Sequence, residues 1–122
     1  IRVSACSELQ KALLTTGLPS WNAENLERNL RLVHYLTENS QGVRRLGSVA
    51  IALCYTACGR IDAHWDLGST PWDIAAGTLI VEEAGGVVTD ITGAPEYFQP
   101  PYSFIASGQG IDRELRAVLI QN

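Results

Sequence analysis

Leucine and valine residues recur at helical spacing in the segment that follows Asn22, which predicts an amphipathic helix. Its apolar positions are Leu26, Leu30, Val33 and Leu36. The predicted solvent-facing side carries the charged residues Glu24, Glu27, Arg28, Arg31 and Glu38. Asn22 is the predicted N-cap, because its short polar side chain can accept a hydrogen bond from an N–H group of the first turn.

Two more helices follow from the same kind of pattern. Residues 111–120 form an amphipathic repeat that predicts a closing helix. Its inward-facing residues are Leu115, Val118 and Leu119. Ser48 is the predicted N-cap of a helix over residues 49–58, which Gly59 ends.

Short apolar blocks between the helices predict strands. They cover residues 1–3, 43–46, 61–65, 87–89 and 104–106. Ser7 is expected to cap a brief helix, after which the apolar run 12–14 leads into a loop at residues 17–19. Alternation of this kind predicts an α/β fold, with a mixed, largely parallel sheet flanked by helices.

Composition narrows the class of protein. The chain of 122 residues is about the size of one domain and carries a formal net charge of −4. Its pI of about 5.0 argues against a nucleic-acid partner, for which clustered basic residues are expected. No apolar run approaches the ~20 residues that span a bilayer, and the first residues lack the pattern of a signal peptide. These features predict no membrane partner and a cytoplasmic location.

The three cysteines indicate reduced thiols rather than a disulfide framework, because their number is odd. Cys54 and Cys58 are four residues apart and close in sequence to His64, which leaves a soft-metal site conceivable. The small apolar residues around them favour a packing helix instead.

The segment PWDIAAGTLIVEEAGG carries the main candidate for chemistry. Pro71 suits the first turn of a helix, and paired glycines, Gly85 and Gly86, suit its end. Asp73 is therefore placed near a helix N-terminus, where its carboxylate could bind a hard cation or simply cap the helix. Its neighbour Trp72 is expected to be a packing anchor.

Polar residues also follow three predicted strand ends, where ligands collect in open α/β sheets. These junctions are Gly47 with Ser48, Asp66 with Gly68, and Asp73. Gly47 would let a ligand approach the backbone, and the amides of Ser48 and Val49 open a helix suited to anions or hydroxyl groups. Asp66 can accept hydrogen bonds from hydroxyl groups. The junctions could converge on one pocket, although Gly47 and Ser48 also fit an ordinary strand exit and helix cap.

The W-D-x-A-A-G string at Trp72 and the later E-A-G-G string resemble the C-terminal motif of the inositol monophosphatase family of magnesium-dependent sugar and polyol phosphatases. Other segments are similar to family landmarks in the same order. They are residues 1–18, RLGS at 45–48, GRIDAHW at 59–65 and FIAS at 104–107.

The resemblance implies that residues 1–122 are the C-terminal domain of such a protein, half of a layered αβαβα sandwich. The family's first half, with a metal-binding glutamate and a D-P-x-D-G-T segment, has no counterpart here, and we expect it to be excised, cleaved or lost. By the same resemblance Asp73 is a Mg²⁺ ligand, and no other catalytic residue lies in this half. Gly47, Ser48, Val49 and Asp66 are then substrate-binding residues. The family usually has glutamate at the position of Asp66, so the shorter side chain bears on the substrate.

The expected reaction is hydrolysis of a phosphate monoester of a small polyol or sugar, with inositol 1-phosphate as the first candidate. Histidinol phosphate, fructose 1,6-bisphosphate and a 3′-phosphonucleotide are alternatives within the family. A non-catalytic interaction or dimerisation domain is the rival from another class. The expected partners are the missing N-terminal half and, in a homodimer, a second copy.

Overall fold

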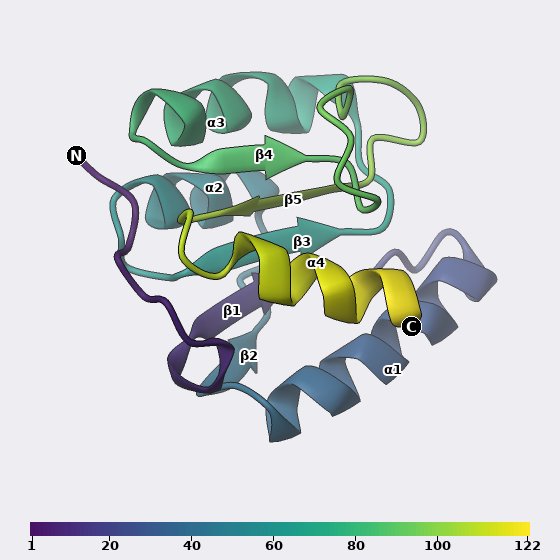
Figure 1. The fold of residues 1–122 in the computed structure, drawn as a ribbon. Coiled ribbons are helices and arrows are strands. Elements are labelled where there is room, and N and C mark those ends of the chain that lie inside the picture. Colours follow the sequence, from purple (N-terminus) through teal and green to yellow (C-terminus); the bar gives the residue numbers. More distant parts are fainter.

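The computed structural model describes all 122 residues as a single five-stranded sheet with helices on both faces (Figure 1). The strands are β1 (Leu13–Thr16), β2 (Gly42–Arg44), β3 (Ala63–Asp66), β4 (Val87–Thr89) and β5 (Phe104–Ser107). The helices are α1 (Ala23–Glu38), α2 (Val49–Ala57), α3 (Pro71–Glu83) and α4 (Asp112–Gln121), with a short 3₁₀ turn η1 (Leu9–Lys11). The predicted α/β class is confirmed.

The strand order is β2-β1-β3-β5-β4. β1 pairs in parallel with β2 and β3, whereas β5 pairs antiparallel with both β3 and β4. Four strands therefore run in one direction and β5 alone runs in the other. This confirms a mixed sheet in which most strands share a direction, and it brings the carboxyl ends of β1, β2 and β3 to the same edge.

Strand alternation divides the core between the two faces of the sheet. On one face, residues of α1 and α4 pack over the strands, with Leu32, Leu115, Leu14, Trp65 and Ile105 among the members of this cluster. On the other face, α2 and α3 pack over the strands, with Leu53, Ile74, Val81, Phe104 and Ala106 in the cluster. His64 and Asp66 alternate with Trp65, so they point to the α2 and α3 side.

Two predicted caps are confirmed by their hydrogen bonds. Oδ1 of Asn22 accepts from the N–H group of Asn25 at 3.0 Å, at the start of α1. Oγ of Ser48 accepts from the N–H group of Ile51 at 3.2 Å, at the start of α2. Ser7 caps nothing, because η1 begins after Glu8 and has no side-chain cap.

The N-terminal strand prediction is wrong. Residues 1–3 form no strand; the N–H group of Val3 donates to the carbonyl oxygen of Ala84 at 3.1 Å, and its side chain packs against the cluster formed by α2 and α3. The first strand is β1 instead, in the segment where the apolar run 12–14 was expected to lead directly into a loop. Two other strands shift, since β2 starts one residue before the predicted 43–46 and β3 starts two residues after the predicted 61–65.

The inward face of α1 is also rotated from the predicted one. Leu30 is 50% exposed, while Asn29 and Leu32 are fully buried. Asn29 is buried because its amide is fully used: Oδ1 accepts from Trp65 Nε1 at 2.6 Å, and Nδ2 donates to the Gly17 carbonyl at 2.6 Å. No helix in the structure has the length and apolar character needed to cross a membrane.

Candidate functional site

A cavity of about 450 Å³ opens at the carboxyl ends of β1, β2 and β3, beside the N-termini of α2 and α3. All five predicted site residues line it: Gly47, Ser48, Val49, Asp66 and Asp73. The expected convergence of the three strand-end junctions on one pocket is therefore present in the geometry.

The wall formed by Gly47 and α2 is an open backbone surface. Gly47 has a φ of +78° and no atom within 4 Å of where a Cβ would lie, so a ligand can approach its backbone directly. The N–H groups of Val49 and Ala50 make no hydrogen bond within the chain, as first-turn donors of a helix do. Arg45, an exposed cation, lines the same cavity. This wall can accept an anion or a polar oxygen.

Asp66 is the last residue of β3, not the start of a loop, and it is only 4% exposed. Its Oδ1 accepts from the N–H group of Gly17 at 3.2 Å, and its Oδ2 lies 2.9 Å from Nε2 of His64. Each carboxylate oxygen can accept about two hydrogen bonds, so acceptor capacity remains beside the cavity.

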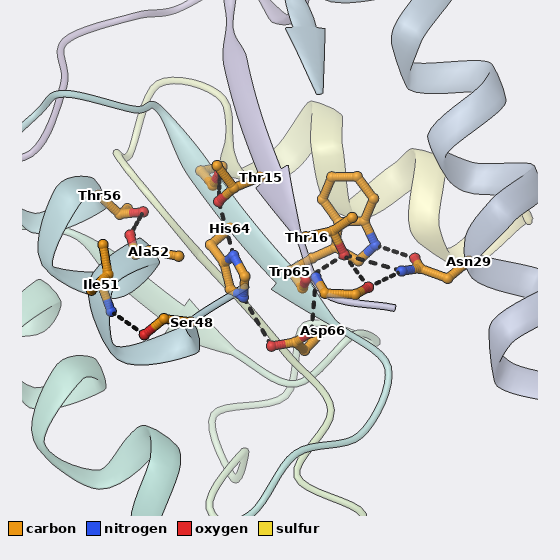
Figure 2. Close-up of polar contacts among 12 residues, drawn as sticks. Thr15, Thr16, Asn29, Ser48, Ile51, Ala52, Thr56, His64, Trp65 and Asp66 are labelled. Atoms are coloured by element: carbon orange, nitrogen blue, oxygen red, sulfur yellow. Dashed lines mark hydrogen bonds and ion pairs between the residues drawn. The ribbon is translucent and has the colours of Figure 1, made fainter. Parts of the chain in front are cut away.

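Behind Asp66 runs a buried chain of polar side chains that the sequence reading missed (Figure 2). Oγ1 of Thr15 lies 2.8 Å from Nδ1 of His64, whose Nε2 reaches Asp66. His64 is 2% exposed, and its ring centroid lies 5.7 Å from that of Phe104. The signal was the spacing itself, because two residues apart on a strand share one face.

Asp73 is the third residue of α3 and is exposed, with no hydrogen bond or ion pair to its side chain. Thr70 occupies the N-cap position, so Asp73 does not cap the helix. Its free carboxylate at the cavity is a suitable oxygen ligand for Mg²⁺. The structure has no group of three His, Cys, Asp or Glu side chains able to hold a metal ion.

Cys54, Cys58 and His64 do not form a group that could hold a metal ion. All three cysteines are free, and Cys54 is exposed on α2. Trp72 is not the expected packing anchor, since it is 79% exposed, whereas Trp65 is fully buried. The difference follows from position: Trp65 lies on a central strand, and Trp72 lies on the outer side of the first turn of α3.

Comparison with known proteins relates this chain to one family. The inositol monophosphatase family matches residues 1–122. An inositol-1-monophosphatase of Synechocystis is 47% identical over 95 residues, which are 78% of this chain and 33% of that protein. A Pseudomonas aeruginosa protein named Nus factor SuhB is 43% identical over 101 residues, 81% of this chain and 37% of that protein.

A solved inositol monophosphatase structure from Anabaena (Nostoc) superposes with a TM-score of 0.93 at 40% identity, and the match covers 99% of this chain and 48% of that one. The chain thus spans about a third to a half of the length of these relatives. The family match extends over every residue of the sheet, the helices and the cavity wall, and this chain belongs to the inositol monophosphatase family.

Proposed function

We propose that this chain is the substrate-binding half of a magnesium-dependent phosphatase that hydrolyses a phosphate monoester of a small polyol or sugar, inositol 1-phosphate being the first candidate. The observation that carries the proposal is the single cavity into which the open start of α2, Asp66 and Asp73 converge. Family membership supports the phosphatase class.

Each wall of the cavity has a separate part in this proposal. The free N–H groups at the start of α2 and the Arg45 cation would attract and orient negatively charged or polar substrate oxygens. Gly47 leaves room for that approach. Asp66, with acceptor capacity beside the cavity, would bind hydroxyl groups of the polyol.

Asp73 would hold one Mg²⁺ ion. When bound, Mg²⁺ supplies charge neutralisation at the phosphate and lowers the pKa of a coordinated water. Mg²⁺ prefers about six oxygen ligands, so the other protein ligands must come from residues outside this chain. The relatives, each more than twice as long as this chain, have room for them.

The decisive experiment compares the purified 122-residue chain, the N-terminal half, and a mixture of both, with inositol 1-phosphate and Mg²⁺. We expect no measurable hydrolysis by this chain alone and recovery of turnover in the mixture. The control is the same mixture prepared with the Asp73→Asn variant of this chain, which should lack the recovered activity. Substantial magnesium-dependent hydrolysis by this chain alone would show that the assignment of the missing ligands is wrong.

A second candidate is a non-catalytic interaction or dimerisation domain. The observation that favours it is the name Nus factor SuhB carried by relatives at 36–43% identity. Histidinol phosphate, fructose 1,6-bisphosphate and a 3′-phosphonucleotide remain the alternative substrates. Substrate profiling of the full-length protein separates these possibilities, since a non-catalytic protein would hydrolyse none of the four. A cytoplasmic location, a homodimer and the absence of nucleic-acid and membrane partners stay predictions.

A further inference from the structure

The Asp66 carboxylate is held at both oxygens by two neighbours, Gly17 and His64, that line the cavity with it. The Gly17 N–H group reaches Oδ1 at 3.2 Å, and Nε2 of His64 reaches Oδ2 at 2.9 Å. The approach at Gly17 is close enough that a Cβ there would lie 2.7 Å from Oδ1. Two contacts on different oxygens prevent rotation of the carboxylate about its Cβ–Cγ bond.

The chemistry of the three side chains determines which atom donates and which accepts in each of their hydrogen bonds. An ionised carboxylate only accepts hydrogen bonds, so Nε2 of His64 must carry a proton and donate it to Asp66. In a neutral imidazole the other nitrogen is then an acceptor. Nδ1 lies 2.8 Å from the Thr15 hydroxyl, which can donate to it. The Thr15 hydroxyl also lies 3.4 Å from the carbonyl oxygen of Ala63, but Nδ1 is the nearer acceptor, so Thr15 matches the tautomer that Asp66 requires.

Burial makes this arrangement rigid. The side chains of His64 and Asp66 are 3% and 6% exposed, and Thr15 is fully buried. Phe104 packs against the imidazole. In such surroundings an unpartnered nitrogen or oxygen is costly, so the three groups are satisfied together or not at all.

We propose that His64, fixed by Thr15, is a positioning residue that turns the remaining lone pairs of Asp66 toward the cavity, where they select substrates bearing hydroxyl groups. The inference rests on the proposed function and adds to it a determinant of specificity. It assigns no part in bond cleavage to His64, whose ring nitrogens contact Thr15 and Asp66.

The first experiment needs no turnover. Imidazole ¹⁵N spectra of the ¹⁵N-histidine-labelled full-length protein, with His64→Phe to assign the signal, report which ring nitrogen carries the proton. We expect protonated Nε2 and bare Nδ1, and we expect Thr15→Val to weaken this preference. A His64 with a bare Nε2 cannot donate to Asp66 and would overturn the inference.

The second experiment separates positioning from a general loss of structure. In the full-length protein, His64→Phe keeps a ring of similar size and removes both nitrogens. We expect the KM for inositol 1-phosphate to rise about tenfold or more, as for loss of a hydrogen bond to a charged group. The KM for ethyl phosphate, an ester with no hydroxyl group, should stay within twofold, and kcat should change little for either.

His64→Gln is the matched rescue, because its amide nitrogen can reach about as far as Nε2 and should restore most of the affinity for inositol 1-phosphate. Equal changes in KM for both esters, or no change for either, would overturn the inference. A wild-type protein that hydrolyses neither ester would overturn the proposed function and the substrate-selecting part of this inference. The ¹⁵N spectra would still decide whether His64 holds Asp66.

Discussion

Gly77 of α3 faces Leu53 of α2 so closely that a Cβ at Gly77 would lie 2.7 Å from Cβ of Leu53. The two helices are thus in contact through the backbone of one and a fully buried side chain of the other. This contact fixes the spacing between α2 and α3, whose first turns both line the cavity.

Gly77→Ala is therefore expected to destabilise the protein, although alanine is the better helix former by about 1 kcal/mol. The added methyl group meets a packed side chain, and overpacking of this kind costs roughly 1–3 kcal/mol. Urea unfolding of wild type and variant measures the difference. Ala76→Gly, at an exposed position of α3, is the control for helix propensity alone and should lower the free energy of unfolding by about 1 kcal/mol. A Gly77→Ala protein as stable as wild type would contradict this description of the interface.

Ser48→Ala removes the side-chain bond to the N–H group of Ile51. We expect a loss of about 1 kcal/mol in the free energy of unfolding, the usual effect of losing an N-cap. Ser48→Asp keeps an acceptor at the same place and should be close to wild type in the same urea titration. If both variants lose equal stability, the cap does not act through this hydrogen bond.

Asp73→Asn distinguishes a metal-binding role of Asp73 from a structural one. The side chain makes no hydrogen bond and lies on an exposed first turn, so the change in unfolding free energy should stay below ~1 kcal/mol, the scale of a helix-dipole interaction. In the full-length protein we expect loss of most turnover and of magnesium dependence, measured by initial rates across a magnesium titration. Near-normal rates at both low and saturating magnesium would remove Asp73 from the metal site.

Asp66→Asn in the full-length protein should act on the other wall of the cavity. Its amide nitrogen would be a donor where Gly17 or His64 now donates, so one of these contacts must break. We expect a higher KM for inositol 1-phosphate and a weaker preference for it over ethyl phosphate, with a smaller effect on kcat. A loss confined to kcat would place Asp66 in the chemical step instead.

Acid stability should depend on Asp90. Burial raises the pKa of its carboxyl, but hydrogen bonds from Thr92 and Ala94 outweigh this and hold the pKa below its ordinary value of 3.8. Oδ1 accepts from Thr92 N at 2.8 Å and from Ala94 N at 2.9 Å. A lowered pKa adds stability that is present above pH 3.8 and is lost as the pH falls through the folded-state value.

Asp90→Asn keeps an acceptor oxygen but cannot titrate. The variant should therefore be less stable than wild type at neutral pH, and the difference should shrink as the pH falls below 3.8. Urea midpoints measured between neutral pH and about pH 2 test this. A difference that stays constant over the whole range would contradict the role assigned to the carboxylate.

α3 is apolar on its exposed side as well as its buried side, which is typical of a helix that packs against a further layer. Leu79 is 57% exposed and Ile80 is 38% exposed. We expect the 122-residue chain alone to associate and to bind an apolar dye, and Leu79→Glu to reduce both. Leu30→Glu, at a half-exposed leucine of α1, is the matched control. A monodisperse wild-type monomer without dye binding would contradict the prediction.

Local signals made the helices predictable. Asn22 and Ser48 cap α1 and α2 through side-chain oxygens that act within three residues, so no knowledge of the fold is needed to place them. The same holds for the convergence of Gly47, Asp66 and Asp73, because it follows from strand direction and the known place of ligands in α/β sheets.

What could not be predicted depends on residues distant in sequence. β1 carries Leu14, Thr15 and Thr16, all buried, because it lies between two other strands with both faces covered, and such strands lack alternation. Asn29 is buried instead of Leu30 because Trp65, 36 residues later, supplies its partner. Thr15 meets His64 only through the pairing of β1 with β3.

The strand order has a consequence for the growing polypeptide. β5 is synthesised after the other four strands of this sheet, yet it lies between β3 and β4 and makes every pairing that β4 has. Until Phe104–Ser107 leaves the ribosome, β4 has no neighbour, and the β3 edge beside the forming cavity stays open to other chains. Translation of β5 is thus the step that joins β4 to the rest of the sheet.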